Sequence, residues 1–287
     1  MASASLLEGL SHIRNDYDAI LCDVWGVIHD GKRAFGPACE ALRRFRETGG
    51  AVVLITNAPV PKSRVTGLFP KLGVPASCFD DVVTSGDATR HELQRRAPGP
   101  VYPIGLRDDR SVYEGLDLDF TKDPAEARVV CCTSLREYPG GHPDSYRAEL
   151  QELARLALPM VCANPDIQFR HGETLIWAAG AVAALYEALG GKVIRPGKPD
   201  AAIYRLAFDR LATITGREIA PRRALAIGDG PATDVRGAMA AGLDALFIGG
   251  GIHGHALTAG EGFLEAAESV LASDGAAARY AMPELAW

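Results

Sequence analysis

Three short apolar runs stand out in the sequence because each ends in a polar residue that a buried strand rarely carries. The runs are AILCD, AVVLITN and ALAIGD, which end at Asp23, at Thr56 and Asn57, and at Asp229. Fully apolar strands that alternate with helical segments are typical of a parallel sheet with helices on both faces. Ligands of such sheets bind beyond the carboxyl ends of the strands. The pattern therefore predicts a doubly wound α/β core in which the polar strand ends meet at one crevice.

Start and stop signals place helices between these strands. Residues 36–48 begin next to a proline and end at two glycines, and residues 61–72 end at a glycine, which are typical helix boundaries. After ALAIGD, the segment TDVRGAMAAG predicts a helix and DALFIGG a last strand. Another strand and a helix beginning near Gly86 are expected from DDVVTSGDATRHEL.

The pattern of predicted elements changes between residues 85 and 195. Short strands (PVYPIG, ARVVCCTS, PMVCANP) and frequent proline and glycine replace the earlier pattern, with helices expected at 144–156 and 174–189. We interpret residues 85–195 as an inserted second domain. Residues 1–84 and 196–287 then form the core domain, which agrees with a length suited to two domains.

Composition narrows the class of partner. A net charge of -6 offers no basic surface for nucleic acid or for an anionic membrane, so a small molecule is the expected partner. The longest apolar run, residues 175–186, is about half the roughly 20 residues that cross a bilayer. The first residues do not follow the pattern of a secretory signal, and the six cysteines show no zinc or C-x-x-C spacing. We expect a cytoplasmic protein with reduced, buried thiols.

Three aspartates suggest phosphoryl-transfer chemistry. Asp23, at a strand end, is placed as a carboxylate that attacks a phosphoryl group. Asp229 and Asp234 lie at a strand-to-helix junction, and carboxylates are ligands that Mg²⁺ prefers. Each aspartate taken alone also fits ordinary turn or capping duty. Together they predict a nucleophile beside a magnesium site.

Further polar residues fit a phosphate-binding role. Thr56 and Asn57 offer a hydroxyl and an amide at another strand end, suited to hydrogen bonds with phosphate oxygens. Lys198, in the segment GKP, is a cation expected near a helix N-terminus, where backbone N–H groups favour anions. Phosphoryl transfer depends mainly on positioning and on charge stabilisation, which these groups supply.

The order of these motifs resembles the haloacid dehalogenase superfamily. Its series is a strand-end D-x-D-G-[TV], a Thr or Ser at the second strand end, a Lys and a G-D-x₃₋₄-D; the chain has DVWGV, TNAP, GKP and GDGPATD. TSGDA, NPD and the large insertion are similar to class IIA, which includes the N-acetylglucosamine-operon phosphatase and 4-nitrophenylphosphatase types. The resemblance covers nearly the whole chain and implies that the insertion is an α/β cap that sets substrate choice.

The resemblance also implies roles for single residues. Asp23 would be the nucleophile and, with Asp229, would bind Mg²⁺, while Asp234 would hold the water shell of the metal. The backbone carbonyl of Trp25 would complete the metal ligands. Phosphate would be bound by Thr56 and the catalytic lysine Lys198, while Asn57 stays a phosphate-binding candidate because of its amide. Asn164 and Asp166 are candidate cap residues for contact with the substrate. Members of the class often pair through the cap, so a homodimer is a candidate assembly.

The sequence departs from the family pattern at Trp25. The family has an aspartate there, which protonates the leaving oxygen and later deprotonates the attacking water, an effect of about 10²- to 10⁴-fold. An indole performs neither step. A bacterial branch of class IIA that this chain resembles bears Trp at the same position.

Three interpretations of Trp25 remain open. In the first, the enzyme cleaves aryl, enol or acyl phosphates, whose leaving groups need little protonation. In the second, another group replaces the aspartate, and the candidates are His29, Asp30, Asp166 and His171. In the third, the protein binds a phosphorylated metabolite without efficient turnover. A phosphotransferase, active only with an acceptor alcohol, is a further alternative. We favour a slow or specialised phosphohydrolase because the other parts of the site are present.

The glycine-rich stretch GGGIHGHAL, residues 249–257, is expected to form a loop within reach of the site. It lacks the G-x-G-x-x-G arrangement before a helix that binds dinucleotides. His253 and His255 are spaced as two metal ligands, but no further ligand accompanies them, and a surface position is the favoured interpretation.

Overall fold

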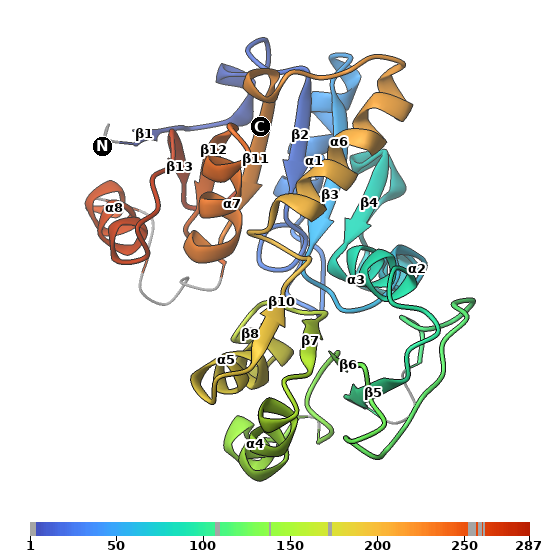
Figure 1. Cartoon of the computed structure of the whole chain (residues 1–287). Coiled ribbons are helices and arrows are strands. Elements are labelled where there is room, and N and C mark those ends of the chain that lie inside the picture. The colour runs from blue at the N-terminus through green and yellow to red at the C-terminus, as the bar shows by residue number, and fades with distance from the viewer. Residues whose placement is uncertain are drawn as a thin grey trace. The chain divides into compact units, whose positions relative to one another are not determined.

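The structure is a computed structural model that describes residues 4–106, 110–137, 139–171, 174–251, 257, 260 and 262–287. The chain forms two compact units (Figure 1). The first contains the described residues of 1–56, 66–83 and 203–287, and the second those of 57–65 and 84–202. Residues 57–65 and 196–202 thus group with the second unit, although the sequence suggests that they belong to the core domain. The expected domain boundaries themselves stay a prediction.

A seven-stranded sheet, in the order β1-β13-β12-β11-β2-β3-β4, is the centre of the first unit. Neighbouring strands from β1 through β11 and β2 to β3 run parallel. The strands are Ser5–Leu6 (β1), Ala19–Cys22 (β2), Ala51–Thr56 (β3), Asp81–Thr84 (β4), Ala224–Gly228 (β11), Asp244–Ile248 (β12) and Tyr280–Met282 (β13). Because β11, β2 and β3 are adjacent and parallel, their carboxyl ends lie at one edge of the sheet.

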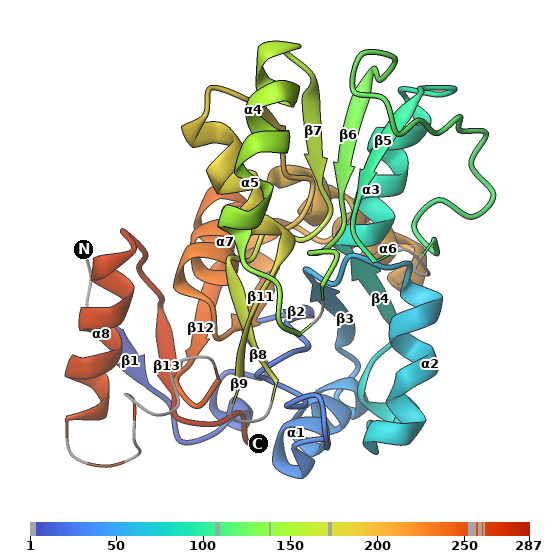
Figure 2. The same cartoon turned by 90° about the horizontal axis from the view of Figure 1, so that it is seen from below.

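Helices cover both faces of this sheet. Alternate strand residues such as Leu21 and Val53 share a core cluster with the apolar side of α6, where Ile203 and Leu211 are fully buried. Figure 2 shows α1 on the opposite side of the sheet from α7. Both faces of the sheet are therefore buried under helices, as the apolar runs predict. The helices are Gly36–Glu47 (α1), Lys62–Leu72 (α2), Ala201–Thr215 (α6), Arg236–Ala240 (α7) and Phe263–Ser273 (α8), with short helical turns at Leu10–His12, Ala76–Cys78 and Pro221–Arg223 and a π-helix at Pro231–Val235.

The second unit is a smaller three-layer α/β domain. Its parallel sheet has the order β10-β7-β6-β5. Alternation along β6 sends Val129 and Cys131 to the face that packs on Leu93 of α3, and Val130 and Cys132 to the face of α4 and α5. The elements are Ser85–Gln94 (α3), Val101–Ile104 (β5), Val129–Cys132 (β6), Pro143–Tyr146 (a 3₁₀ turn), Arg147–Arg155 (α4), Pro159–Cys162 (β7), Gln168–His171 (β8), Thr174–Trp177 (β9), Ala179–Ala188 (α5) and Lys192–Ile194 (β10).

Two expectations about single elements are wrong. Residues 174–177 are a strand, antiparallel to β8, and only Ala179–Ala188 is helical. The Thr-Leu-Ile-Trp segment has high strand propensity, but it runs into the alanine-rich helix with no polar break. DALFIGG is also not the last strand, because β13 follows α8 and pairs with both β12 and β1.

All six cysteines are buried and reduced, as expected. Among the described residues, no helix has the length and apolar character needed to cross a membrane.

Candidate active site

Three aspartates meet at the carboxyl edge of the first unit's sheet. Asp23 follows β2, Asp229 follows β11, and Asp234 lies in the π-helix Pro231–Val235. One carboxylate oxygen from each lies within 4.8 Å of the others, and all three residues are buried, with 6 to 7% of their surface exposed. The structure thus brings together residues that are more than 200 positions apart in sequence.

Backbone hydrogen bonds fix the two ends of this cluster. The N–H of Asp23 donates to the carbonyl of Ile227 at 2.8 Å, which continues the ladder between β2 and β11 by one residue. The Oδ1 atom of Asp23 accepts the N–H of Val24 at 2.7 Å. At the other strand end, Oδ2 of Asp234 accepts the N–H of Gly230 at 3.1 Å. Both carboxylates are therefore held by their own strand-end turns.

Two glycines from different loops enclose the carboxylate of Asp229. A Cβ atom would lie 2.1 Å from Oδ2 of Asp229 at Gly26 and 1.9 Å from it at Gly251. Gly26 also has φ of +85°, a conformation that disfavours other residues. The backbone therefore approaches Asp229 so closely that a side chain at either position would displace it.

A divalent cation fits this cluster. Three buried carboxylates that lie this close together repel one another and lose hydration. Carboxylate oxygens are hard donors, and Mg²⁺ binds to one or two of them together with water and phosphate oxygens. Asp23, Asp229 and Asp234 therefore offer carboxylate oxygens of the kind that such a cation binds.

Trp25 stands beside this cluster with its ring packed against the following loop. The half-buried indole meets the ring of His29 edge to face, with centroids 5.1 Å apart and an interplanar angle of 76°. A Cβ atom at Gly31 would lie 2.5 Å from the indole. The ring thus lies directly on the loop backbone and has a structural function.

Neither nearby titratable residue resembles a ready proton donor. Burial lowers the pKa of His29 to about 4, against the opposing charge of Asp30, so the imidazole is neutral at pH 7. Its Nδ1 accepts the N–H of Gly31 at 3.1 Å. Burial disfavours the charge on Asp30, but the N–H groups of Arg33 and Lys32, both 2.8 Å from its Oδ1, lower its pKa overall. Asp30 is therefore a charged turn residue.

Thr56 is the buried last residue of β3. The next residue, Asn57, begins the second unit, where it contacts two other predicted site residues. Its Oδ1 accepts the N–H of Lys198 at 2.8 Å, and its Nδ2 donates to Oδ1 of Asp166 at 2.8 Å and to the carbonyl of Lys198 at 3.3 Å. Asn57 and Lys198 are buried. The Asn57 amide is thus occupied by protein groups at both of its ends.

The remaining candidates have more local surroundings. Oδ1 of Asn164 accepts the N–H of Asp166 at 3.0 Å, which closes the turn after β7. His171 is the last residue of β8, in a hairpin of the second unit. His253 and His255 lie outside the described residues.

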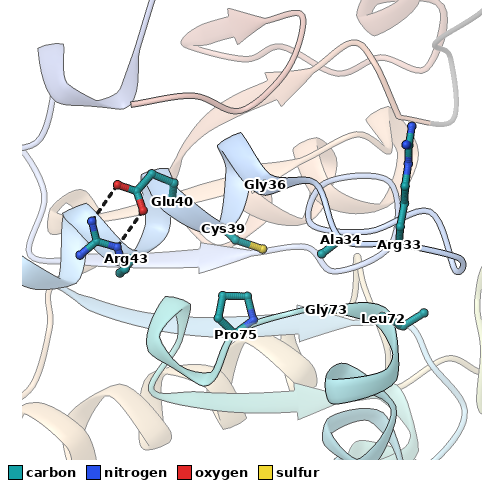
Figure 3. A pocket seen from close by; sticks show the side chains of 9 residues that line it. All are labelled: Arg33, Ala34, Gly36, Cys39, Glu40, Arg43, Leu72, Gly73 and Pro75. Atoms are coloured by element: carbon teal, nitrogen blue, oxygen red, sulfur yellow. Dashed lines mark hydrogen bonds and ion pairs between the residues drawn. The ribbon is translucent and has the colours of Figure 1, made fainter.

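A separate hollow of about 330 Å³ lies beside α1 in the first unit (Figure 3). None of the three clustered aspartates lines it. Arg43 forms an ion pair with Glu40 one turn earlier on α1, and Arg33 comes from the loop before α1. We assign no chemistry to this hollow.

Two features of the site were missed from the sequence. Gly26 and Gly251 were not recognised as neighbours of Asp229, although a glycine directly after the DVW motif and a run of three after a strand are signals of close backbone approach. The role of Asn57 in holding Lys198 has no local signal, because its partners lie 109 and 141 residues away.

Two protein-family models match the chain. One, described as haloacid dehalogenase-like hydrolase, matches residues 20–119, and the other, described as HAD-hydrolase-like, matches residues 195–273. Asp23 and Thr56 fall in the first match, and Lys198, Asp229 and Asp234 in the second.

Known proteins are similar along most of the chain. A solved hydrolase of the haloacid dehalogenase-like family from Brucella suis is 39% identical, with a TM-score of 0.88 over 98% of this chain and 100% of that chain. The 5'-nucleotidase YutF of Bacillus subtilis is 26% identical over 82% of this chain and 88% of its own length. A glycerol phosphate phosphatase from Mycobacterium tuberculosis, solved in complex with magnesium, is 28% identical, with a TM-score of 0.65 over 87% and 74% of the two chains.

Proposed function

The chain belongs to the haloacid dehalogenase-like hydrolases, and from this premise we propose that it is a Mg²⁺-dependent phosphatase of a small phosphorylated metabolite. The observation that carries the proposal is the buried cluster of Asp23, Asp229 and Asp234 at the carboxyl edge of the sheet. Relatives named as a 5'-nucleotidase and as a glycerol phosphate phosphatase support a small phosphate ester as substrate.

Asp23 is assigned the role of nucleophile. An oxygen of its carboxylate forms a bond to phosphorus while the bond from phosphorus to the leaving oxygen breaks, which gives an aspartyl-phosphate. Water then attacks the phosphorus, the bond to Asp23 breaks, and inorganic phosphate leaves. Thr56 and Lys198 are assigned to the phosphate oxygens, where a hydroxyl donor and a cation stabilise the developing charge.

The metal site is assigned to the same cluster. Asp23, Asp229 and the backbone carbonyl of Trp25 would hold Mg²⁺, and Asp234 would hold its water shell. When bound, the ion neutralises charge on the phosphoryl oxygens. Its ligand set does not need the side chain at position 25, so the Trp in place of Asp leaves metal binding intact.

Trp25 determines which substrates we expect to be cleaved. Without an acid at this position, an alkoxide leaving group departs unprotonated, whereas an aryl, enol or acyl phosphate loses a more stable anion. The neutral His29 and the turn residue Asp30 do not supply the missing proton. We therefore propose turnover that is slow or limited to good leaving groups.

A second function is favoured by the same residue. A phosphate site with a metal but without the family's aspartate at position 25 also suits a protein that binds a phosphorylated metabolite without efficient turnover. The two proposals share their ligands and differ in whether Asp23 becomes phosphorylated and is then freed of the phosphate by hydrolysis.

The test is hydrolysis of 4-nitrophenyl phosphate and of a sugar monophosphate, with Mg²⁺ or with EDTA. We expect the wild type to cleave the aryl ester only with Mg²⁺, Asp23→Asn to be inactive, and Trp25→Asp to extend activity to the sugar phosphate. Trp25→Phe is the matched control, because it keeps an aromatic ring and adds no acid. If the wild type cleaves neither substrate and Trp25→Asp creates activity, the natural protein is better described as one that binds a phosphorylated metabolite. Product formed only on addition of an acceptor alcohol would indicate a phosphotransferase.

A further inference from the structure

The side-chain amide of Asn57 forms hydrogen bonds with both the N–H and the carbonyl of Lys198. Its Oδ1 accepts the Lys198 N–H at 2.8 Å, and its Nδ2 donates to the Lys198 carbonyl at 3.3 Å. The same Nδ2 donates to Oδ1 of Asp166 at 2.8 Å. Asn57 is 4% exposed and Lys198 2%, so these hydrogen bonds lie where water does not compete for them.

The chemistry of the partners fixes the orientation of the amide. The N–H of Lys198 is only a donor and therefore requires the oxygen of Asn57. The carbonyl of Lys198 and the carboxylate of Asp166 accept hydrogen bonds and therefore require the amide nitrogen. With Oδ1 taken by an N–H and both hydrogens of Nδ2 assigned, Asn57 has little capacity left for a phosphate oxygen.

The segment that follows Asn57 is held in place by α3. The N–H of Gly86 donates to the carbonyl of Ala58 at 3.0 Å. A Cβ atom at Gly86 would lie 2.3 Å from the carbonyl oxygen of Val60, so that loop and the start of α3 are in direct backbone contact. The hydroxyl of Thr84 caps α3 by accepting the N–H of Asp87. The loop that begins at Asn57 is therefore held by backbone contacts with the start of α3.

Lys198 is approached just as closely by its neighbours. A Cβ atom at Gly197 would lie 2.4 Å from Oγ of Ser85 and 2.7 Å from Oδ1 of Asn57. The peptide before Lys198 thus lies flat against Asn57 and α3. Such contact leaves few positions for the backbone of Lys198 and hence for the origin of its side chain.

We propose that Asn57 is a positioning residue, which fixes the backbone of Lys198 and links it through Asp166 to the turn after β7. This inference rests on the proposed function, in which the ammonium of Lys198 holds phosphate. It replaces the direct phosphate contact that the sequence suggests for Asn57. Its consequence is that Asn57 and Asp166 affect phosphate binding together and through their mutual hydrogen bond.

Exchanging the two side chains tests this coupling. Asn57→Asp keeps an acceptor for the Lys198 N–H but places a second carboxylate against Asp166. Adding Asp166→Asn restores the hydrogen bond between the two side chains with donor and acceptor exchanged, whereas the hydrogen bond to the Lys198 carbonyl stays lost. The readouts are the affinity for inorganic phosphate in the presence of Mg²⁺, kcat/KM for 4-nitrophenyl phosphate, and the thermal midpoint.

We expect Asn57→Asp to weaken phosphate binding by about tenfold or more, as the loss of a hydrogen bond to a charged group implies. The double variant should bind phosphate more tightly than Asn57→Asp but more weakly than wild type, because it regains the hydrogen bond to position 166 and not the one to the Lys198 carbonyl, and cycles of contacting residues are not additive. Tyr102→Phe, which removes a hydrogen bond to Glu149 in the same unit, is the control for general destabilisation and should leave phosphate affinity unchanged. A double variant as weak as Asn57→Asp would overturn the inference and restore the direct contact.

Phosphate affinity also separates this inference from the proposed function. A wild type that binds phosphate but shows no turnover contradicts the phosphatase proposal and leaves the exchange experiment valid. Lys198→Met should lose phosphate affinity; if its affinity equals that of wild type, Lys198 does not hold phosphate and the positioning role is wrong.

Discussion

Gly26 provides a sharp test of the proposed metal site, because a single methyl group there meets the carboxylate of Asp229. In Gly26→Ala the new Cβ would start 2.1 Å from Oδ2. Non-bonded heavy atoms settle near 3.5 Å, so the carboxylate or the loop must move by about 1.4 Å. Mg²⁺ requires ligands close to 2.0–2.1 Å in near-ideal geometry, and a shift of that size removes Asp229 from the ligand set.

Gly49 is a matched control for the strain of the substitution. Its φ is +94°, close to the +85° of Gly26, and its Cβ would meet no atom within 4 Å. In both variants the left-handed backbone costs about 1–2 kcal/mol, which corresponds to a fall of roughly 2–8 °C in the thermal midpoint for a unit of this size. Only Gly26→Ala should also disturb Asp229.

The assay is the Mg²⁺ dependence of 4-nitrophenyl phosphate hydrolysis. We expect the Mg²⁺ concentration at half-maximal rate to rise about 10- to 100-fold in Gly26→Ala, the range found when a group that orients a metal ligand is disturbed. Gly49→Ala should match wild type in this value. Equal Mg²⁺ requirements for the two variants, at similar thermal midpoints, would show that Asp229 does not bind the metal.

Three further predictions concern metal, packing and thiols. Mg²⁺ should raise the thermal midpoint, because an ion at 100 times its dissociation constant stabilises the folded state by about 2.7 kcal/mol. Asp229→Asn should remove most of this shift, as measured by calorimetry with Mg²⁺ and with EDTA. A full shift in the variant would contradict the assignment of Asp229. Leu150→Ala, at a fully buried position of α4, should destabilise the second unit by about 2–5 kcal/mol, measured by urea unfolding, whereas a loss below about 1 kcal/mol would speak against a packed core there. Burial raises the pKa of Cys131 and Cys162 to about 12, so almost none of either thiol is ionised at pH 8. A disulfide reagent should therefore label these two thiols only after denaturation. Rapid labelling of both in the folded protein would refute their burial.

The cluster of aspartates was predictable because strand ends are visible in the sequence. Asp23 and Asp229 each follow an apolar run, and parallel strands bring such ends to one edge. The adjacency of β2 and β11, which lets the two carboxylates meet, is a property of strand order. The order of strands in a sheet depends on how the whole chain packs, so the local sequence does not give it.

Other features were beyond sequence reasoning for physical reasons. β13 has three residues and β1 two, too few for a periodic pattern, and they form only by adding to an existing sheet. Residues 174–177 were assigned to the helix that follows them because an apolar run shows no boundary between strand and helix. The contacts of Asn57 depend on how distant loops pack, which propensity does not describe.

The strand order β12-β11-β2-β3 has a consequence for biosynthesis. The second unit takes most of its residues from the continuous stretch 84–202, so its sheet can form as soon as that stretch has left the ribosome. Asp23 must wait for β11 and Asp234, which are synthesised about 200 residues later, more than about 10 s at 5–20 residues per second. During that interval β2 lacks its neighbour β11, and this apolar edge is open to chaperones and to other nascent chains. Asp23 is therefore synthesised early in translation, whereas the aspartate cluster is complete only near the end.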